Sequence, residues 1–195
     1  MSGRPTLFLD RDGVLTVENS YITRPEMLRL EAGAAEAVRL LNEAGVLAVV
    51  VSNQSGVARG LMTEQDMAAV HARLEELLSA GGARLDGAYY CPNHLEGTVE
   101  RFSRDASCRK PETGMIDAAV RDLDIELAAS AMVGDQLTDV QLADRAGIPC
   151  VIVETGKGPV TFEEAEACGL PVAKRASGVL EAARWMISRV EEMRG

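Results

Sequence analysis

The sequence predicts a doubly wound α/β fold, with a Rossmann-like, mostly parallel sheet that carries helices on both faces. Two features of the chain predict it. Short apolar runs rich in β-forming residues alternate with longer amphipathic segments of helical period, and polar residues follow each apolar run directly. Because parallel strands are joined by right-handed helical crossovers, helices would cover both sides of such a sheet, and ligands would gather at the carboxyl ends of its strands.

The expected strands are four short runs, at 6–9, 46–51, 131–133 and 148–153. The expected helices lie between and after them, at 34–44, 64–80, 114–123, 137–146 and 178–194. Gly45, Gly81 and Gly147 directly follow three of these helices, and glycine ends a helix there because it adopts the left-handed conformation at little cost. Residues 92–108 have no clear period, so we expect a long loop with a functional or metal-binding role.

Length and charge narrow the class of protein. The 195 residues carry a formal net charge of −10 and suffice for one α/β core, so we expect a single domain over 1–195. The acidic charge disfavours nucleic acid and anionic membranes as partners and favours a small molecule bound in a local positive pocket. No apolar run reaches the roughly 20 residues of a membrane span, and the first residues do not resemble a signal peptide. We therefore expect a cytoplasmic monomer whose four cysteines are free thiols.

The strongest local pattern is a pair of carboxylates one residue apart, Asp10 and Asp12, where the first strand ends. Two acids this close repel one another, which raises one pKa unless a cation is present. The pair therefore suits either a divalent hard metal ion or a division of nucleophile and acid roles. Asp-Gly after a strand is also common turn chemistry, so the pair alone leaves both interpretations open.

Three further polar clusters follow along the chain. Residues 52–56, Ser-Asn-Gln-Ser-Gly, offer hydroxyl, amide and backbone donors for phosphate oxygens, or simply form a tight turn. Arg109 and Lys110 place two cations before a proline, where plain surface charge is the alternative. Asp135 ends a strand and Asp139 follows one helical turn later. This spacing suits a metal ligand with a supporting carboxylate, or a charge that complements the helix dipole.

In this order, the four clusters supply every part that phosphoryl transfer requires. The chain resembles the haloacid dehalogenase superfamily of phosphatases, and within it the family of D-glycero-D-manno-heptose 1,7-bisphosphate phosphatases. The similarity extends from about residue 7 to residue 156, through the segments FLDRDGVLTVENSY, VVSNQSGVARG, DGAYYCPNH, CRKPETGM and MVGDQLTDVQLA. It implies a magnesium-dependent phosphatase that removes the C7 phosphate of the heptose bisphosphate, a sugar phosphate, through an aspartyl phosphate.

The resemblance implies a role for each cluster. Asp10 would attack phosphorus, and Asp12 would protonate the leaving oxygen and later deprotonate water. Ser52 and Lys110 would bind the phosphoryl oxygens. Mg²⁺ would be held by a carboxylate oxygen of Asp10, the backbone carbonyl of Asp12 and Asp135. The residues that match the family's substrate contacts are Glu18, Asn19, Ser20, Tyr21, Asn53, Gln54, Ser55 and Arg109. Arg109 is the natural partner for a second anionic group.

The chain departs from the family pattern in its long loop. Relatives often carry a zinc site of the form Cys-x-His followed by Cys-x-Cys directly before Arg-Lys-Pro. Here Asn93 and Ala106 replace two of the four ligands, which leaves Cys91, Cys108 and a His94 displaced by one residue. Since a closed zinc site needs four good ligands, we do not expect zinc as a cofactor. In the family's arrangement Cys91 and Cys108 could approach each other, either as packed thiols or, on oxidation, as a disulfide. Gln136 also stands where close relatives often have lysine.

The superfamily usually inserts a cap domain after the first motif or between the second and third. The first interval has room for only a flap and a helix, and the second for one helix, one strand and the long loop. We therefore expect no separate cap domain and an open site whose selectivity rests on loops.

Several alternatives share parts of this pattern. Histidinol-phosphate phosphatases and polynucleotide 3′-phosphatases carry the same core motifs, but the continuation Gln-Ser-Gly-Val-Ala-Arg-Gly favours the heptose type and the acidic charge disfavours DNA. The non-enzymatic alternatives are a receiver-like phospho-acceptor domain and a sugar-phosphate binding module.

Overall fold

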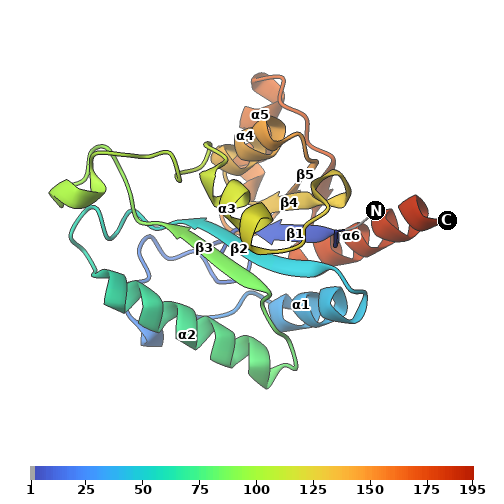
Figure 1. The fold of residues 1–195 in the computed structure, drawn as a ribbon, viewed down its shortest axis with the longest axis horizontal. Helices are drawn as coiled ribbons and strands as arrows, with labels where there is room; N and C mark the ends of the chain where they lie inside the picture. Colours follow the sequence, from blue (N-terminus) through green and yellow to red (C-terminus); the bar gives the residue numbers. More distant parts are fainter. Residues whose placement is uncertain (1–2) are drawn as a thin grey trace.

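The structure, a computed structural model that describes residues 3–195, is built around one six-stranded parallel sheet (Figure 1). The strand order is β3-β2-β1-β4-β5-β6, and every neighbouring pair runs parallel. The chain starts at the centre and extends first to one edge and then to the other, which confirms the doubly wound α/β fold. The strands are β1 (Thr6–Leu9), β2 (Leu47–Asn53), β3 (Gly87–Cys91), β4 (Ala131–Gly134), β5 (Cys150–Val153) and β6 (Lys174–Ala176).

Helices cover both faces of the sheet. On one face lie α1 (Ala34–Glu43), α2 (Glu64–Ala80) and α6 (Val179–Arg194), whose buried residues share one apolar cluster with the strands. On the other lie α3 (Gly114–Asp122), α4 (Leu137–Ala146) and α5 (Gly158–Ala167), which build a second cluster. Figure 1 shows α4 and α5 above the sheet and α1 and α2 below it. Three short 3-10 helices complete the fold, at Pro25–Met27, Glu100–Phe102 and Leu127–Ala129.

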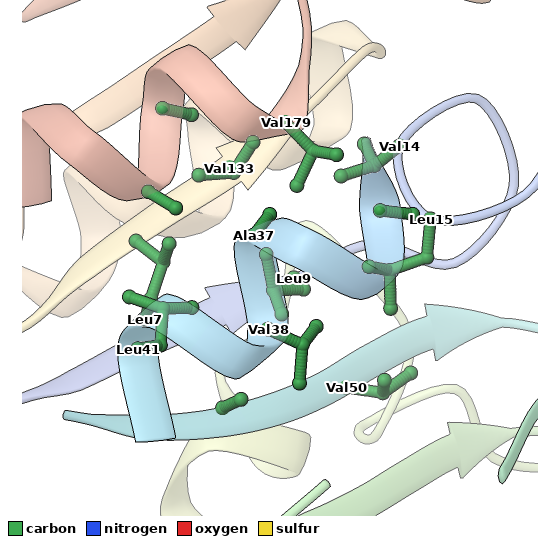
Figure 2. Close-up of a cluster of buried hydrophobic side chains, with 14 of the residues drawn as sticks. Leu7, Leu9, Val14, Leu15, Ala37, Val38, Leu41, Val50, Val133 and Val179 are labelled. Atoms are coloured by element: carbon green, nitrogen blue, oxygen red, sulfur yellow. The ribbon is translucent and has the colours of Figure 1, made fainter. Parts of the chain in front are cut away.

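The two apolar clusters arise from the alternation of side chains along the strands. In β1, Leu7 and Leu9 belong to the cluster under α1 and α6, whereas Phe8 belongs to the cluster on the opposite face. Successive side chains of a strand point to opposite faces, so a strand buried on both sides is apolar throughout. Figure 2 shows Val38 and Leu41 of α1 beside the β1 leucines. This packing fixes the central strand, whose carboxyl end carries the first motif.

Most expected elements lie within a residue or two of their observed bounds. Strand β3 was expected between the second and third motifs but without bounds, and α5 and β6 were missed. Helix α5 begins with Gly158 and Pro159, and its apolar residues do not repeat with a helical period. Strand β6 has only three residues, and its Lys174 and Arg175 give it the charged character of a sheet edge. Both elements form because they pack against β5, a tertiary contact that a local pattern does not display.

The segment between β3 and α3 is ordered by contacts with the loop after β2. The backbone carbonyl of Ala58 accepts hydrogen bonds from the amides of Thr98 and Val99, at 2.8 and 2.9 Å. Phe102 packs against Val57 and other apolar side chains of that loop. Figure 1 shows this segment, in yellow-green, extending beside the loop after β2. The two loops therefore form one unit at the carboxyl edge of the sheet.

The intervals in which a cap domain would be inserted are short. Between β1 and α1 the chain forms a flap with isolated bridges from Thr16 to Asp12 and Leu30, together with one 3-10 helix. Between β2 and β3 it contains α2, which starts at a capping box formed by Thr63 and Asp66. Within residues 3–195, no helix combines the length and apolar character that a bilayer crossing demands.

Candidate active site

Three buried carboxylates meet at the carboxyl ends of the two central strands. Asp10 follows β1, Asp135 follows β4, and Asp139 lies in the first turn of α4. Strands β1 and β4 are direct neighbours, and the Asp10 amide donates a 3.0 Å hydrogen bond to the carbonyl of Val133. One carboxylate oxygen from each acid lies within 4.8 Å of the others. We call Asp10, Asp135 and Asp139 the carboxylate cluster.

Lys110 supplies the positive charge that faces the carboxylate cluster. Its Nζ lies 2.8 Å from Oδ2 of Asp10 and 2.7 Å from Oδ1 of Asp139, and it donates to the carbonyl of Val51 at 3.2 Å. Burial alone would lower the pKa of Lys110, but the two carboxylates outweigh it and hold this pKa above its ordinary value. Lys110 therefore remains charged at neutral pH.

Asn53 fixes the backbone that carries Lys110. The Lys110 amide donates to Oδ1 of Asn53 at 2.9 Å, and Nδ2 of Asn53 donates back to the Lys110 carbonyl at 3.1 Å. Lys110 belongs to no strand, yet these paired bonds join it to the end of β2. The predicted convergence of the first, third and fourth motifs is therefore observed.

Asp135 is enclosed by two glycines from different loops. Gly13 and Gly156 have positive φ angles of 81° and 58°, and a Cβ at either position would overlap the Asp135 carboxylate. Oδ2 of Asp135 accepts a 2.9 Å hydrogen bond from the Lys157 amide, whereas its Oδ1 is buried without a hydrogen-bond partner among residues 3–195. A cluster of carboxylate oxygens, one of them unpaired, is a donor set that fits a hard divalent cation.

The stability of the metal-free protein tests whether the Asp135 carboxylate is buried beside other negative charges. Burial, followed by repulsion from Asp10, raises the pKa of Asp135 to about 8. Because this value exceeds the ordinary value of 3.8, the native state keeps a proton that the unfolded state releases, and stability falls as pH rises from about 4 to 8. In chelator at pH 8, we expect Asp135→Asn to raise Tm, since an amide avoids the buried charge.

Thermal unfolding with and without Mg²⁺ makes this comparison. Magnesium should raise the Tm of the unmodified protein and have little effect on the Asp135→Asn variant. The exposed Asp124 offers a matched control, because Asp124→Asn should change neither result. A lower Tm for Asp135→Asn in chelator would contradict this description of the site.

Asp12 lies apart from the carboxylate cluster and points toward hydrogen-bond donors. It accepts from Nε and Nη2 of Arg11 at 2.9 and 2.8 Å, from Nε2 of Gln54 at 3.0 Å, and from the Thr16 hydroxyl at 2.9 Å. Burial alone would raise its pKa, but Arg11 outweighs burial and holds the pKa of Asp12 below its usual value. The two aspartates of the first motif thus have different environments.

A cavity of about 260 Å³ opens above these residues. Most of the predicted site residues line it: Asp10, Asp12, Glu18, Ser20, Tyr21, Ser52, Asn53, Gln54, Ser55, Arg109 and Lys110. Two do not. Asp135 lies buried behind the wall, and Asn19 is exposed at the outer turn of the flap and does not line the cavity.

Three basic residues of the cavity were not singled out from the sequence as substrate contacts. Arg59 follows the second motif, His94 begins the loop after β3, and Lys157 follows β5. Nη2 of Arg59 lies 3.3 Å from Nε2 of His94, and burial together with the charge of Arg59 lowers the pKa of Arg109. We call Arg59, His94 and Arg109 the basic rim. The position of Lys157 just after the end of a strand is the sequence feature that could have identified it as a site residue.

Comparison with known proteins identifies the family. A family model described as HAD-hydrolase-like matches residues 107–179. The D-glycero-D-manno-heptose-1,7-bisphosphate 7-phosphatase of Thermosynechococcus vestitus is 47% identical over 164 residues, which cover 82% of this chain and 84% of that protein. The chain belongs to the family of heptose bisphosphate phosphatases. The D-glycero-beta-D-manno-heptose-1,7-bisphosphate 7-phosphatase of Escherichia coli K12 is 42% identical, over 84% of this chain and 85% of that protein.

Solved structures of similar proteins share the whole fold. The D,D-heptose 1,7-bisphosphate phosphatase of B. bronchiseptica, solved in complex with magnesium and phosphate, is 30% identical and superposes with a TM-score of 0.83. That match covers 94% of this chain and 98% of the solved chain. A HAD-like phosphatase of Mesorhizobium loti is 32% identical with a TM-score of 0.82, over 99% of this chain and 88% of the solved one.

The cysteines depart from what the sequence suggested. Cys91 and Cys108 form a disulfide with a Cα–Cα distance of 5.5 Å. The expectation of four free thiols is therefore wrong for this pair, and the oxidised form that the family's arrangement allowed is observed. Cys150 is a buried free thiol and Cys168 an exposed one. The disulfide closes the base of the segment after β3, where the family resemblance implies a zinc site.

Zinc content is a direct test of this departure. We expect the purified protein to hold well below one equivalent of zinc, because a disulfide offers no thiolate and Asn93 and Ala106 are poor ligands. Elemental analysis after dialysis against a mild chelator measures it. In reducing buffer, the combined variant Asn93→His and Ala106→Cys should gain zinc. Stoichiometric zinc in the unmodified protein would contradict the prediction.

Proposed function

We propose that this chain is a magnesium-dependent phosphatase that removes the C7 phosphate of D-glycero-D-manno-heptose 1,7-bisphosphate. The observation that carries the proposal is the layout of the cavity. Asp10 of the carboxylate cluster and its partner Lys110 line this cavity, and the basic rim lines the same cavity. A molecule with two phosphates matches both features. The names of the relatives identify the same substrate and bond.

In the proposed reaction, an oxygen of the Asp10 carboxylate attacks phosphorus in line. The bond from phosphorus to the sugar oxygen breaks, and that oxygen receives a proton from Asp12. Because Arg11 keeps the Asp12 carboxyl ionised in the free protein, Asp12 would take up this proton as the substrate phosphate binds. The product remaining on the enzyme is an aspartyl phosphate. Asp12, now a carboxylate, takes a proton from water, whose oxygen attacks the same phosphorus and releases phosphate with Asp10 restored.

Charge control in these steps comes from residues around Asp10. Lys110, 2.8 Å from Asp10, would offset the charge of the transferred group, and the Ser52 hydroxyl lines the same part of the cavity. Magnesium, held by Asp10, the Asp12 carbonyl and Asp135, would lower the repulsion between the nucleophile and the phosphate. The unpaired Oδ1 of Asp135 supports this assignment.

The basic rim would bind the phosphate that is not transferred. Arg59 and Arg109 are half-buried cations that pair with no carboxylate among residues 3–195, so both are available for an anion. Glu18, Ser20 and Tyr21 line the same cavity and can contact sugar hydroxyls. A cationic amine, as in histidinol phosphate, would meet like charge at the rim, which favours the heptose bisphosphate over that alternative.

Replacement of Arg109 tests this assignment. We expect Arg109→Ala to lower kcat/KM for the bisphosphate by about 10- to 150-fold, the loss of one charge-assisted contact of roughly 1.5–3 kcal/mol. The loss for the heptose 7-monophosphate should be much smaller. Arg121→Ala, which removes an exposed arginine on α3, is the matched control and should leave both substrates unchanged.

A panel with the heptose bisphosphate, its 7-monophosphate, histidinol phosphate and a 3′-phosphorylated oligonucleotide completes the experiment. The bisphosphate should have the highest kcat/KM. Equal effects of Arg109→Ala on the bisphosphate and the monophosphate would contradict the role of the rim, and a preference for histidinol phosphate would contradict the substrate.

A further inference from the structure

The Asp12 carboxylate is held by hydrogen bonds from several neighbouring protein groups, although it also faces the cavity. Its two oxygens accept four hydrogen bonds, two from the Arg11 guanidinium, one from Gln54 and one from the Thr16 hydroxyl. A fork-shaped contact from arginine fixes both the position and the plane of a carboxylate. The orientation of Asp12 is thus determined by its neighbours before any substrate binds.

Arg11 has no direct access to substrate. It is the largest fully buried side chain among the described residues, with 0% of its surface exposed, and it does not line the cavity. Its guanidinium lies over the ring of Tyr90, 5.8 Å from the centroid, and the Tyr90 hydroxyl lies 2.8 Å from Nδ1 of His71. Burial of an arginine is costly without a partner. Here the partner is Asp12.

Gln54 completes the arrangement. Its Oε1 accepts from Nη2 of Arg11 at 2.9 Å, while its Nε2 donates to Asp12 at 3.0 Å and to the Ser52 hydroxyl at 3.2 Å. These contacts use both amide hydrogens and orient the side chain unambiguously. Although Gln54 borders the cavity, its polar atoms are therefore directed to other protein groups, which differs from the substrate contact that the family resemblance implied.

We propose that Arg11 and Gln54 are positioning residues that fix the Asp12 carboxylate where it can exchange a proton with the leaving oxygen. This inference rests on the proposed function and extends it. The same carboxylate must serve two successive steps, first at the sugar oxygen and then at water. A displacement of about 1 Å can reduce such a step by roughly 100-fold. A rigid frame of buried donors around the Asp12 carboxylate prevents this displacement.

Leaving-group dependence is the readout that separates positioning of Asp12 from general support of the fold. A sugar alkoxide is a poor leaving group and needs the proton from Asp12, whereas dinitrophenolate leaves without one. We expect Arg11→Lys to lower kcat/KM for the heptose bisphosphate by about tenfold or more and for 2,4-dinitrophenyl phosphate by less than about twofold. Gln54→Leu should show the same selectivity. Asp12→Asn, assayed in parallel, gives the largest difference in kcat/KM loss between the two esters that a defect in Asp12 can cause.

Tyr89→Phe is the matched control, because it removes a hydroxyl that bonds Asp122 and does not line the cavity. It should leave both esters within about twofold of the unmodified enzyme. If Arg11→Lys does not fold, Gln54→Leu carries the test alone. Equal losses for both esters, or no loss for either in both variants, would overturn the proposal.

The outcome is separable from the proposed function. Activity that survives Asp10→Asn would overturn the nucleophile and the aspartyl phosphate, whatever Arg11→Lys does. Loss of activity in Asp10→Asn, combined with an unselective Arg11→Lys, would overturn only the positioning role.

Discussion

Asp10→Asn should abolish turnover while the protein remains folded. The amide has nearly the size of the carboxylate, so the contacts at the end of β1 are retained, but its uncharged oxygen is a very poor nucleophile. Loss of the covalent step should reduce kcat to less than about a hundredth of the unmodified value, given the usual scale of such contributions. Steady-state release of phosphate from the heptose bisphosphate measures the loss, and thermal unfolding verifies the fold.

Metal removal should produce the same loss reversibly. We expect chelator to stop turnover of the unmodified enzyme and Mg²⁺ to restore it, because Asp10 is one member of the carboxylate cluster that would hold the ion. Asp124→Asn serves as the control for a neutralised but exposed aspartate. Activity above about a hundredth in Asp10→Asn, or restoration by zinc alone, would show that the nucleophile or the metal is assigned wrongly.

Lys110→Met should have the second large effect, on activity and stability together. Methionine has a similar length but no charge, so it would leave Asp10 and Asp139 buried without their cation. Removal of one partner from a buried ionic group costs about 3–5 kcal/mol of unfolding free energy. We also expect kcat/KM to fall by about 10²–10³-fold, since Lys110 would stabilise the charge of the transferred phosphoryl group.

Chemical denaturation and kinetics at the same pH measure both effects. Lys174→Met is the matched control, because Lys174 pairs with Glu181 at the surface, where such pairs contribute about 0–1 kcal/mol. The pKa of Asp139, which burial raises to about 6 despite Lys110, adds a pH test. The stability loss of Lys110→Met should shrink as pH falls toward 5, because a protonated Asp139 needs no cation. A loss as small as that of the control would contradict the description of this pair.

Strand ends were predictable from the sequence because the signal is local. Apolar residues stop near the carboxyl end of each strand: Asp10 and Asp135 directly follow β1 and β4, and Ser52 follows the apolar run of β2 one residue before that strand ends. Parallel topology then brings them to one edge without any knowledge of the contacts. Lys110 depended on the family resemblance, since it reaches the site through paired hydrogen bonds with Asn53 rather than through a strand of its own.

Other features depend on tertiary structure and left no local trace. The sequence places Arg11 between two aspartates but does not indicate that its guanidinium is fully buried, because charged residues are normally exposed. Asn19 lies in the same flap as Glu18, Ser20 and Tyr21, yet the path of the turn directs it away from the cavity. Arg59 and His94 come together only because the loops after β2 and β3 pack against each other.

The paired hydrogen bonds between Asn53 and Lys110 have a consequence for how the substrate range of this scaffold can diverge. Arg109 and Lys110 are adjacent, so an insertion or deletion in the segment after β3 would displace both the rim and Lys110, unless Asn53 holds the backbone in place. Arg59 lies in the loop after β2, and its side chain contacts His94 rather than the carboxylate cluster. Substitutions of Arg59, in evolution or by engineering, can therefore change the size and charge of the substrate that is accepted without altering the residues around Asp10.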